Sequence, residues 1–485
     1  MRNLTLLTDL YQLTMGYGFY RQNKHEEEVV FDLFFRKNAL ITYSVFAGLE
    51  QAMDYLLHWH LDDEDVEYLR SLHLFSEDFI EYIKNMRFTG DVYAVREGEP
   101  VFPGEPILTV KAPLIQAQFA ETALLNIINH QTLIATKSSK ICRATGGKGV
   151  VMEFGLRRAQ GPDAGISGAR AAVIGGCAST SNVIAGEMFD IPVAGTMAHS
   201  WVMGYPTEYE AFRAYADAYP DNCLLLVDTY DTLRSGVPNA IRVFKELQAK
   251  GHKPKGIRLD SGDLAYLSKK ARKMMDEAGF PDAIICVSGD LDERSISSLL
   301  QQGAKIDSWG VGTRLITSED LPALGGVYKM SAIIGKDGSI TPKIKLSDNT
   351  AKITNPSFKK LYRLYDKENG MAIADLITLR EETVDENEPL TIFHPVETWK
   401  KHEVENFRAE ELQYTIVKDG KLVYEFPALT EIREFSKAQK AKFWEEYLRL
   451  DMPQVYKVDL SNALHKLKTS MIDEIRGNTK KGGEK

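Results

Sequence analysis

The chain has 485 residues, of which 44% are hydrophobic and 26% charged, a composition typical of globular proteins with two or three domains. Its formal net charge of −9 argues against a nucleic-acid-binding surface, because such surfaces depend on clustered positive charge. No apolar run approaches the roughly 18–20 residues that span a bilayer. The four cysteines stand singly without CxxC spacing, so neither a zinc site nor a disulfide framework is indicated. We expect a soluble cytoplasmic protein.

Residues 1–130 mix helical patterns with short strands, which predicts an α+β domain. "VREGEPVFPGEPILTVKAP" (95–113) sets Gly and Pro turn signals around β-rich runs. "IQAQFAETALLNIINHQTLIATKSSKICRATGG" (115–147) has helical spacing and closes on two glycines, which predicts a helix and its end.

Residues 131–340 predict a β/α barrel, complete or incomplete, that holds the active site. Short apolar runs suited to buried parallel strands alternate with helical patterns. Three of these runs close on Asp228, Asp260 and Asp290, at intervals of one βα unit. Six such units in series favour a barrel over an open sheet. The runs are "VVMEF", "IPVAGT", "CLLLVD", "GIRLD", "AIICVSGD" and "IDSWGVGT".

Residues 341–485 predict a smaller C-terminal region made of a hairpin and helices. "IVKDGKLVYEF" places Asp419-Gly420 at the turn of the expected hairpin, and a mostly helical tail follows.

The predicted strand ends carry charged, hydroxyl or glycine residues, as the active-site rim of a barrel does. The turns "SGD" and "GVGT" suit a phosphate, although tight turns without a ligand have the same composition. "RLDSGD" offers Arg258, Asp260 and Asp263 for a phosphate, a diol or Mg²⁺, or else a local ion pair. His199 in "GTMAHSW" is either a hydrogen-bonded core residue or a nucleophile at the rim. Of the arginines in "FGLRR", at least one should point into the barrel mouth, where it suits a planar carboxylate.

Together these motifs resemble the nicotinate phosphoribosyltransferase family. The resemblance rests on "TDLYQLTM" (8–15), "EFGLRRAQGPDAG" (153–165), "GTMAHSW" (195–201), "GIRLDSGDL" (256–264) and "GVGTRL…LGGVYKM" (310–330), and "KIKLSDNTAKITNP" (343–356) is similar too. It implies an incomplete barrel of the type II phosphoribosyltransferase kind, and transfer of phosphoribose from phosphoribosyl pyrophosphate to nicotinate in NAD salvage. It also implies coupled ATP hydrolysis through a phosphorylated histidine, Mg²⁺, and a homodimer with shared sites.

The resemblance also implies a role for each matched residue. Phe154 and the partner chain's Tyr11 would enclose the pyridine ring, with Arg157, Thr196 and Ser179 near the nicotinate and phosphoribosyl groups. Arg258 and Asp260 would contact the pyrophosphate and ribose, and His199 would carry the phosphoryl group. The 5′-phosphate pocket would comprise Gly289, Asp290, Gly310, Gly312 and Thr313. Independently of the resemblance, Asp228 or Asp231 in "VDTYD" is a candidate to complete a Mg²⁺ site with Asp260.

Three alternatives remain. A quinolinate enzyme should show more basic residues, because its substrate carries two adjacent carboxylates. A nicotinamide enzyme places an aspartate beside the carboxamide, whereas "GGCASTSN" (175–182) offers Ser179, Thr180 and Ser181 and no carboxylate. A non-catalytic phosphosugar-binding protein would not need the Arg, Asp, His and Gly residues at the site positions.

Overall fold

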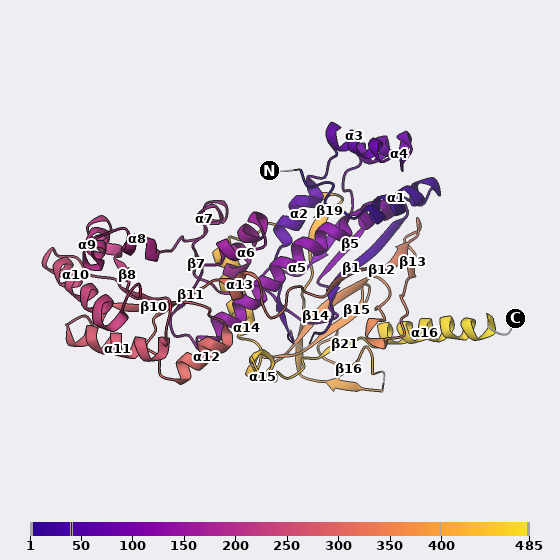
Figure 1. The fold of residues 1–485 in the computed structure, drawn as a ribbon. Coiled ribbons are helices and arrows are strands. Elements are labelled where there is room, and N and C mark those ends of the chain that lie inside the picture. Colours follow the sequence, from indigo (N-terminus) through magenta and orange to yellow (C-terminus); the bar gives the residue numbers. More distant parts are fainter. Residues whose placement is uncertain (1–2, 39, 41, 398, 483–485) are drawn as a thin grey trace. The chain divides into compact units, whose positions relative to one another are not determined.

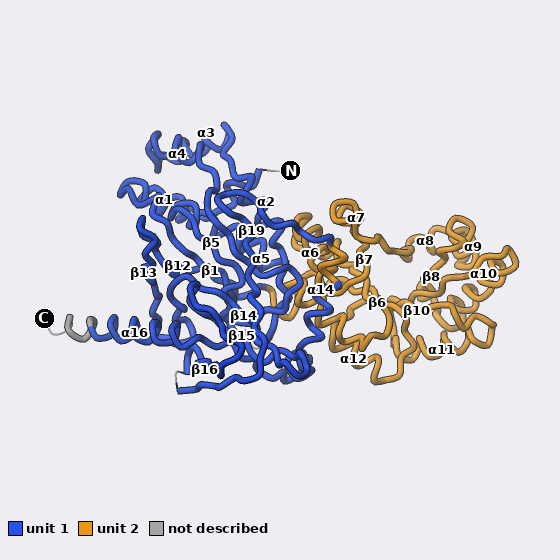
Figure 2. The backbone as a smooth tube through the Cα atoms, turned by 180° about the vertical axis from the view of Figure 1, so that it is seen from behind, with its two compact units in different colours: residues 1–132, 323–428, 434–485 blue, residues 133–322, 429–433 orange. Residues whose placement is uncertain are grey.

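The computed structural model describes residues 3–38, 40, 42–397 and 399–482. The chain forms two compact units (Figure 2). Unit 1 comprises residues 1–132, 323–428 and 434–485, and unit 2 comprises residues 133–322 and 429–433. The predicted division into three domains at about residues 130 and 340 stays a prediction.

Unit 1 contains a seven-stranded antiparallel sheet in the order β13-β12-β1-β5-β3-β19-β20 (Figure 1). Segments from both ends of the chain build it, because β12 pairs with β1 and β19 pairs with β3. Its strands are β1 (Glu28–Phe35), β3 (Asp91–Ala94), β5 (Leu108–Pro113), β12 (Gly326–Ile334), β13 (Ile340–Pro342), β19 (Tyr414–Lys418) and β20 (Lys421–Leu422). The β19–β20 hairpin turns at Asp419 and Gly420, both at positive φ, as "KDGK" predicts.

A six-stranded mixed sheet in unit 1 has the order β17-β16-β21-β15-β14-β18. The sequence predicts a hairpin and helices in the C-terminal region, but it does not predict this sheet. Its strands are β14 (Lys359–Asp366), β15 (Ala372–Leu379), β16 (Leu390–Phe393), β17 (Lys401–Val404), β18 (Phe407–Glu411) and β21 (Val458–Leu460). A short pair, β2 (Ser44–Val45) with β4 (Pro100–Val101), lies in unit 1 as well.

Charged residues inside these strands explain why the alternation of apolar residues is weak. Arg363 of β14 is fully buried and donates to Asp375 of β15, with Nε···Oδ1 at 2.8 Å, and also to Glu99. Lys359 at the start of β14 pairs with Asp32 of β1 at 2.8 Å, and both residues are buried. Buried charges persist only when they are paired and hydrogen-bonded, and a sequence pattern does not show the pairing.

Three helices of unit 1 pack around an apolar cluster that includes Leu13, Trp59, Phe79 and Phe119. They are α1 (Leu10–Arg21), α3 (Asp63–Ser71) and α4 (Glu77–Asn85). Unit 1 also contains α2 (Leu49–Leu57), α15 (Glu445–Leu448) and α16 (Asn462–Gly482), of which α16 contacts β15 and β16. The unit boundaries fall inside α5 (Leu114–Ala144) and α14 (Leu429–Lys440). α5 ends just before Gly146 and Gly147, both at positive φ, so the predicted helix end is confirmed.

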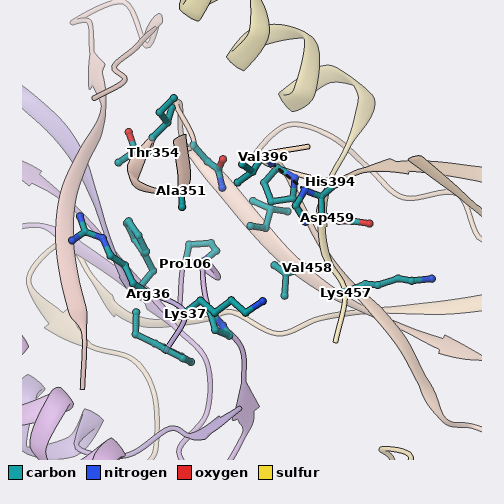
Figure 3. Close-up of a pocket in the computed structure, with 18 of the residues that line it drawn as sticks. Arg36, Lys37, Pro106, Ala351, Thr354, His394, Val396, Lys457, Val458 and Asp459 are labelled. Atoms are coloured by element: carbon teal, nitrogen blue, oxygen red, sulfur yellow. Dashed lines mark hydrogen bonds between the residues drawn. The ribbon is translucent and has the colours of Figure 1, made fainter. Parts of the chain in front are cut away.

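Unit 1 also holds a cavity of about 610 Å³ between strands of its two sheets and the loops at 349–355 and 394–397 (Figure 3). Nothing in the sequence patterns predicts it.

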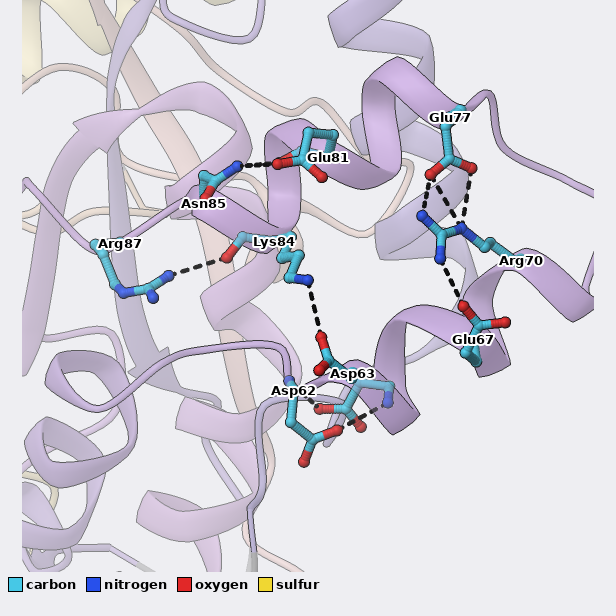
Figure 4. Close-up of polar contacts among 10 residues, drawn as sticks. Asp62, Asp63, Glu67, Arg70, Glu77, Glu81, Lys84, Asn85 and Arg87 are labelled. Carbon is cyan, nitrogen blue, oxygen red and sulfur yellow. Dashed lines mark hydrogen bonds and ion pairs between the residues drawn. The ribbon is translucent and has the colours of Figure 1, made fainter.

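An exposed ion-pair network joins α3 to α4 (Figure 4). Arg70 donates to Glu67 of its own helix at 2.6 Å and to Glu77 of α4, and Lys84 pairs with Asp63 at 2.9 Å. Because all of these side chains are solvent-exposed, each pair contributes little to the stability of the fold.

Unit 2 contains six parallel strands in the order β7-β6-β11-β10-β9-β8. The last strand, β11, pairs with the first, β6, as in a closed barrel. The consecutive strands β7 and β8 do not pair and form the two edges of the sheet, so the barrel is open between them. The incomplete β/α barrel is therefore confirmed. Its strands are β6 (Val150–Glu153), β7 (Ser179–Thr180), β8 (Leu224–Leu226), β9 (Gly256–Leu259), β10 (Ile284–Gly289) and β11 (Ser308–Val311).

The prediction of a strand at "IPVAGT" is wrong, because this segment makes only an isolated bridge between Val193 and Thr180. Pro192 lacks an N–H group and contributes only its carbonyl, which accepts from the Thr180 N–H at 3.1 Å. The segment next to β7 therefore remains extended without continuing the sheet.

Helices alternate with the strands of unit 2, as expected from the helical patterns between the apolar runs, among them α9 (Glu208–Ala218), α10 (Val237–Ala249) and α11 (Leu264–Glu277). The others are α6 (Pro162–Gly175), α7 (Val183–Phe189), α8 (His199–Met203), α12 (Glu293–Gln301) and α13 (Thr313–Ile316). In the described part of the chain, no helix combines the length and apolarity needed to cross a membrane.

Candidate active site

Arg258, on β9, is the centre of a polar cluster at the carboxyl ends of the unit 2 strands. Its Nε donates to Ser288 Oγ on β10 at 2.8 Å, and its Nη2 donates to Asp260 Oδ1 at 2.7 Å. Its Nη1 donates to Thr196 Oγ1 at 3.2 Å. The guanidinium is mostly buried and is held in one orientation by three separate segments. The structure thus brings together three predicted site residues, Arg258, Asp260 and Thr196.

Asp260 follows β9 directly and remains ionised within this cluster. Burial raises the pKa of the Asp260 carboxyl, but the hydrogen bond from Ser288 and the charge of Arg258 outweigh burial and place it below its usual value. Oδ1 accepts from both Arg258 and Ser288, while Oδ2 faces His199. The carboxylate is therefore fixed on one side and available on the other.

Asp228, two residues beyond β8, supports the turn that carries Asp260. Its Oδ2 accepts from the Asp260 N–H at 2.9 Å and from Ser261 Oγ at 2.7 Å. Its Oδ1 is buried and has no hydrogen-bond partner among the described residues. A buried carboxylate oxygen without a donor is costly, and a cation or a substrate hydroxyl would satisfy it.

His199 begins the short helix α8, and its ring lies beside the cluster. Nδ1 is 3.1 Å from Thr229 Oγ1, and Nε2 is 3.9 Å from Asp260 Oδ2. The side chain is 41% exposed, which argues against the alternative of a satisfied core histidine. Nε2 is the ring nitrogen that faces the site.

Two glycines allow the strand ends to approach one another closely. Gly289 has φ +114°, and a Cβ there would lie 2.7 Å from the Asp260 carbonyl oxygen. A Cβ on Gly310 would lie 2.6 Å from the Phe154 ring. Because Gly310 has no side chain, the Phe154 ring packs directly on β11, and the Arg258 guanidinium lies 5.7 Å from the centre of that ring. Because Gly289 has none, the end of β10 approaches the Asp260 carbonyl closely.

A buried carboxylate shapes the turn after β6. Glu153 accepts from Thr180 Oγ1 at 2.6 Å and from the Gly155 N–H. Burial raises the pKa of Glu153, and these hydrogen bonds only partly offset it. Glu153 thereby joins β6 to β7, on which Ser179 is also buried. It is a positioning residue that the motifs did not single out.

The remaining predicted residues do not join the Arg258 cluster by direct contact. Arg157 is exposed, and no described residue hydrogen-bonds to its guanidinium. Asp290 is exposed, and Gly312 and Thr313 begin α13 at the end of β11. Tyr11 belongs to unit 1, where its side chain is about half exposed on α1.

Sequence reasoning missed two residues that the cluster uses. Ser288 holds both Arg258 and Asp260, and Thr229 contacts His199. Ser288 lies in the quoted motif "SGD", and Thr229 directly follows the quoted strand run "CLLLVD", so the strand-end position was the available signal.

Comparison with known proteins identifies the family. The chain is 49% identical over 475 residues to "Nicotinate phosphoribosyltransferase" of Bacillus subtilis. The matched region covers 98% of this chain and 96% of that relative. The chain belongs to the nicotinate phosphoribosyltransferase family. Three family models match it: the nicotinate phosphoribosyltransferase N-terminal domain over 6–129, the family itself over 150–369, and the C-terminal domain over 358–468.

Other members of this family share the whole length and the fold. The human protein named nicotinate phosphoribosyltransferase is 32% identical over 523 residues, or 96% of each chain. The crystal structure of human nicotinic acid phosphoribosyltransferase superposes with a TM-score of 0.85 at 30% identity, covering 96% of this chain and 99% of that one. A nicotinate-nucleotide pyrophosphorylase from Pyrococcus furiosus, at 23% identity and a TM-score of 0.68 over 91% of this chain and 96% of that one, shares the fold.

Proposed function

We propose that this chain transfers the phosphoribosyl group of phosphoribosyl pyrophosphate to nicotinate, and that it couples this transfer to ATP hydrolysis through His199. The nicotinate phosphoribosyltransferase activity follows from family membership over the whole chain, and it makes the chain a glycosyltransferase of NAD biosynthesis. The observation that supports a working site is the Arg258 cluster, in which Thr196, Asp260 and Ser288 orient a single guanidinium.

In the transfer step, the nicotinate ring nitrogen forms a bond to ribose C1 while the bond from C1 to the pyrophosphate oxygen breaks. The transition state resembles an oxocarbenium ion, so catalysis depends on positioning and on stabilising the departing negative charge. We assign the second task to Arg258, because its partners fix the guanidinium before substrate binds. Phe154 would supply a face for the pyridine ring, and Gly289, Asp290, Gly310, Gly312 and Thr313 would surround the 5′-phosphate.

In the coupling step, a nitrogen of His199 attacks the γ-phosphorus of ATP, forming an N–P bond while the bond to the ADP oxygen breaks. Nδ1 is engaged by Thr229, so we propose Nε2 as the nucleophile. When Nδ1–H donates to the Thr229 hydroxyl, Nε2 retains its lone pair. Hydrolysis of the phosphohistidine after each transfer would release phosphate and return the histidine.

The carboxylates at this site fit Mg²⁺. Asp228 Oδ1 is a buried oxygen without a partner, and Asp260 Oδ2 faces the open side of the cluster. Mg²⁺ in enzymes commonly uses one or two carboxylates together with water and phosphate oxygens, and Asp228 and Asp260 would supply two carboxylates. Bound Mg²⁺ would neutralise charge on the pyrophosphate.

A direct assay tests this function. The purified chain is incubated with phosphoribosyl pyrophosphate and with nicotinate, nicotinamide or quinolinate, and nucleotide and pyrophosphate are quantified with and without Mg-ATP. We expect nicotinate to be the preferred base and ATP to stimulate its use. A preference for either of the other bases would contradict the proposal, and so would phosphoribosyl pyrophosphate binding without turnover.

We expect Arg157→Ala to lower kcat/KM for nicotinate by roughly 10- to 100-fold, because a charge-assisted hydrogen bond contributes about 1.5–3 kcal/mol. The exposed guanidinium has no protein partner among the described residues, so a substrate carboxylate can engage both of its edges. Steady-state kinetics over a range of nicotinate concentrations measures the change. Arg158→Ala is the matched control on the adjacent residue. If only Arg158→Ala lowers kcat/KM for nicotinate, Arg158 and not Arg157 binds the carboxylate.

We further propose a cytoplasmic homodimer whose sites each take Tyr11 from the partner chain. Two inactive variants, Tyr11→Ala and Asp260→Ala, should then regain activity when they are mixed. About a quarter of the unmodified activity is expected, since half of the dimers are mixed and each of these has one intact site. Failure to recover activity, after native mass spectrometry has shown subunit exchange, would contradict the shared site.

None of the four cysteines, all in the described part of the chain, forms a disulfide, which is consistent with a reducing compartment.

A further inference from the structure

The cavity in unit 1 is built entirely from residues outside the catalytic cluster of unit 2. Its volume of about 610 Å³ lies within the roughly 300–1,000 Å³ that small-molecule sites occupy. One wall is the loop at 349–355, part of the motif "KIKLSDNTAKITNP", to which the proposed catalytic function gives no role. The turn at 394–397 and β21 form a further part of the lining (Figure 3).

Lys468 of α16 lines this cavity and is only 6% exposed. Its ammonium donates to Asn355 Oδ1 at 2.8 Å and to the Pro395 carbonyl at 2.9 Å, which are both neutral acceptors. An ammonium has three N–H donors, and the third has no acceptor among the described residues. Burial, with a smaller contribution from the charge of Lys359, lowers the pKa of Lys468 to about 8.

The neighbouring Lys359 shows what a fully matched buried lysine looks like in this cavity. It forms an ion pair with Asp32 at 2.8 Å and donates to the carbonyl of Ser357 at 2.5 Å. Lys468 has no carboxylate in that position. Keeping a buried charge without a counter-ion is expensive, and such groups are retained mainly at functional sites.

The rest of the lining also favours an anion. Among the described residues that line the cavity, six are Lys or Arg and three are Asp or Glu. The basic residues are Arg36, Lys37, Lys352, Lys359, Lys457 and Lys468, and the acidic ones are Asp32, Glu397 and Asp459. Two of the three acids already have basic partners, Asp32 with Lys359 and Glu397 with Lys400.

Asp459 of β21 is the third acidic residue of the lining, and it is 2% exposed. Its Oδ2 is covered by protein atoms, so we assign it no contact with a ligand. Apolar and ring side chains cover much of the remaining lining, among them Pro106 and Val458, which Figure 3 labels, and Tyr456. These surfaces suit a flat apolar group.

We propose that this cavity is a binding site for a small phosphorylated molecule of the mononucleotide class. The phosphate would complete the hydrogen bonding of Lys468, and the base would pack against Val458 and Tyr456. The site binds its ligand without any covalent step, and it is separate from the residues that we assign to phosphoribosyl transfer.

Photoaffinity labelling of the full-length protein with 8-azido-AMP, followed by peptide mapping, tests the site. We expect label in the segments 349–355, 394–397 or 455–458, and we expect unmodified AMP to compete at least tenfold better than inorganic phosphate. Label confined to peptides of unit 2 would overturn the proposal. Equal competition by inorganic phosphate would overturn the mononucleotide class, because the anion alone would then explain binding.

Substitutions connect the label to the named residues. Lys468→Gln should weaken 8-azido-AMP binding about 10- to 100-fold, whereas Lys466→Gln, on the exposed side of the same helix, should leave it unchanged. Val458→Trp fills the cavity without changing charge and should abolish labelling. This variant tests the site if circular dichroism shows that Lys468→Gln is unfolded. Unchanged labelling in a folded Lys468→Gln or Val458→Trp variant would overturn the proposal.

Discussion

Asp260→Asn should lower kcat/KM for both substrates by roughly 100- to 1000-fold while the protein stays folded. Asp260 Oδ1 accepts from Arg258 and Ser288, and its negative charge balances the mostly buried guanidinium. The amide removes that charge, and its NH₂ group cannot accept a hydrogen bond. Breaking one side of a desolvated, hydrogen-bonded charge pair costs about 3–4 kcal/mol, which corresponds to the stated loss of rate.

Asp263→Asn is the matched control for this prediction. Asp263 lies in the same "RLDSGD" motif, but it caps α11 by accepting from the Tyr266 N–H at 2.9 Å, a task that asparagine performs as well. We expect unchanged kinetics and a nearly unchanged Tm. If Asp260→Asn lost less than tenfold in kcat/KM, or if both variants lost activity equally, Asp260 would not have the role assigned here.

The barrel of unit 2 could be predicted from sequence because its signals are local. Each buried strand, such as "CLLLVD" or "AIICVSGD", is a short apolar run followed by a polar end, and the helices between strands have clear spacing. The parallel order places these ends at one edge, so the meeting of Asp228, Asp260 and Ser288 from three neighbouring strands follows from topology. The one strand predicted wrongly, "IPVAGT", contains Pro192, whose missing N–H weighs against pairing.

The mixed sheet of unit 1 could not be predicted, because its order depends on charges that are matched over long separations. Arg363 meets Glu99, which is 264 positions away along the chain, and Lys359 meets Asp32. A strand that contains a buried arginine or aspartate has the sequence pattern of an exposed segment, because the sequence does not show which residues pair with these charges. The same limit applies to the site, where Thr229 contacts His199 across 30 positions although no motif links the two residues.

His199→Ala should abolish stimulation by ATP while slow, ATP-independent synthesis of nicotinate mononucleotide continues. The ring is 41% exposed, its Nε2 faces the site, and Arg258 and Asp260 lie beside it, so the residue is placed for chemistry rather than for packing. Incubating the unmodified protein with Mg-ATP should add one acid-labile phosphate, detectable by intact mass, and the alanine variant should add none. With phosphate on Nε2, ³¹P and ¹⁵N spectra of labelled protein identify the nitrogen.

Two further variants separate phosphoryl transfer from a structural role. His252→Ala removes a surface histidine whose Nδ1 lies 2.8 Å from Asp221, and we expect it to keep full ATP stimulation. Thr229→Val keeps His199 but removes the hydroxyl that fixes its ring, so phosphorylation should be slower without a matching loss of Tm. A structural histidine would instead show a lowered Tm in His199→Ala, with ATP stimulation intact and no phosphate on the ring. Because phosphate incorporation and Tm are measured independently, the two roles give opposite results on the same set of proteins.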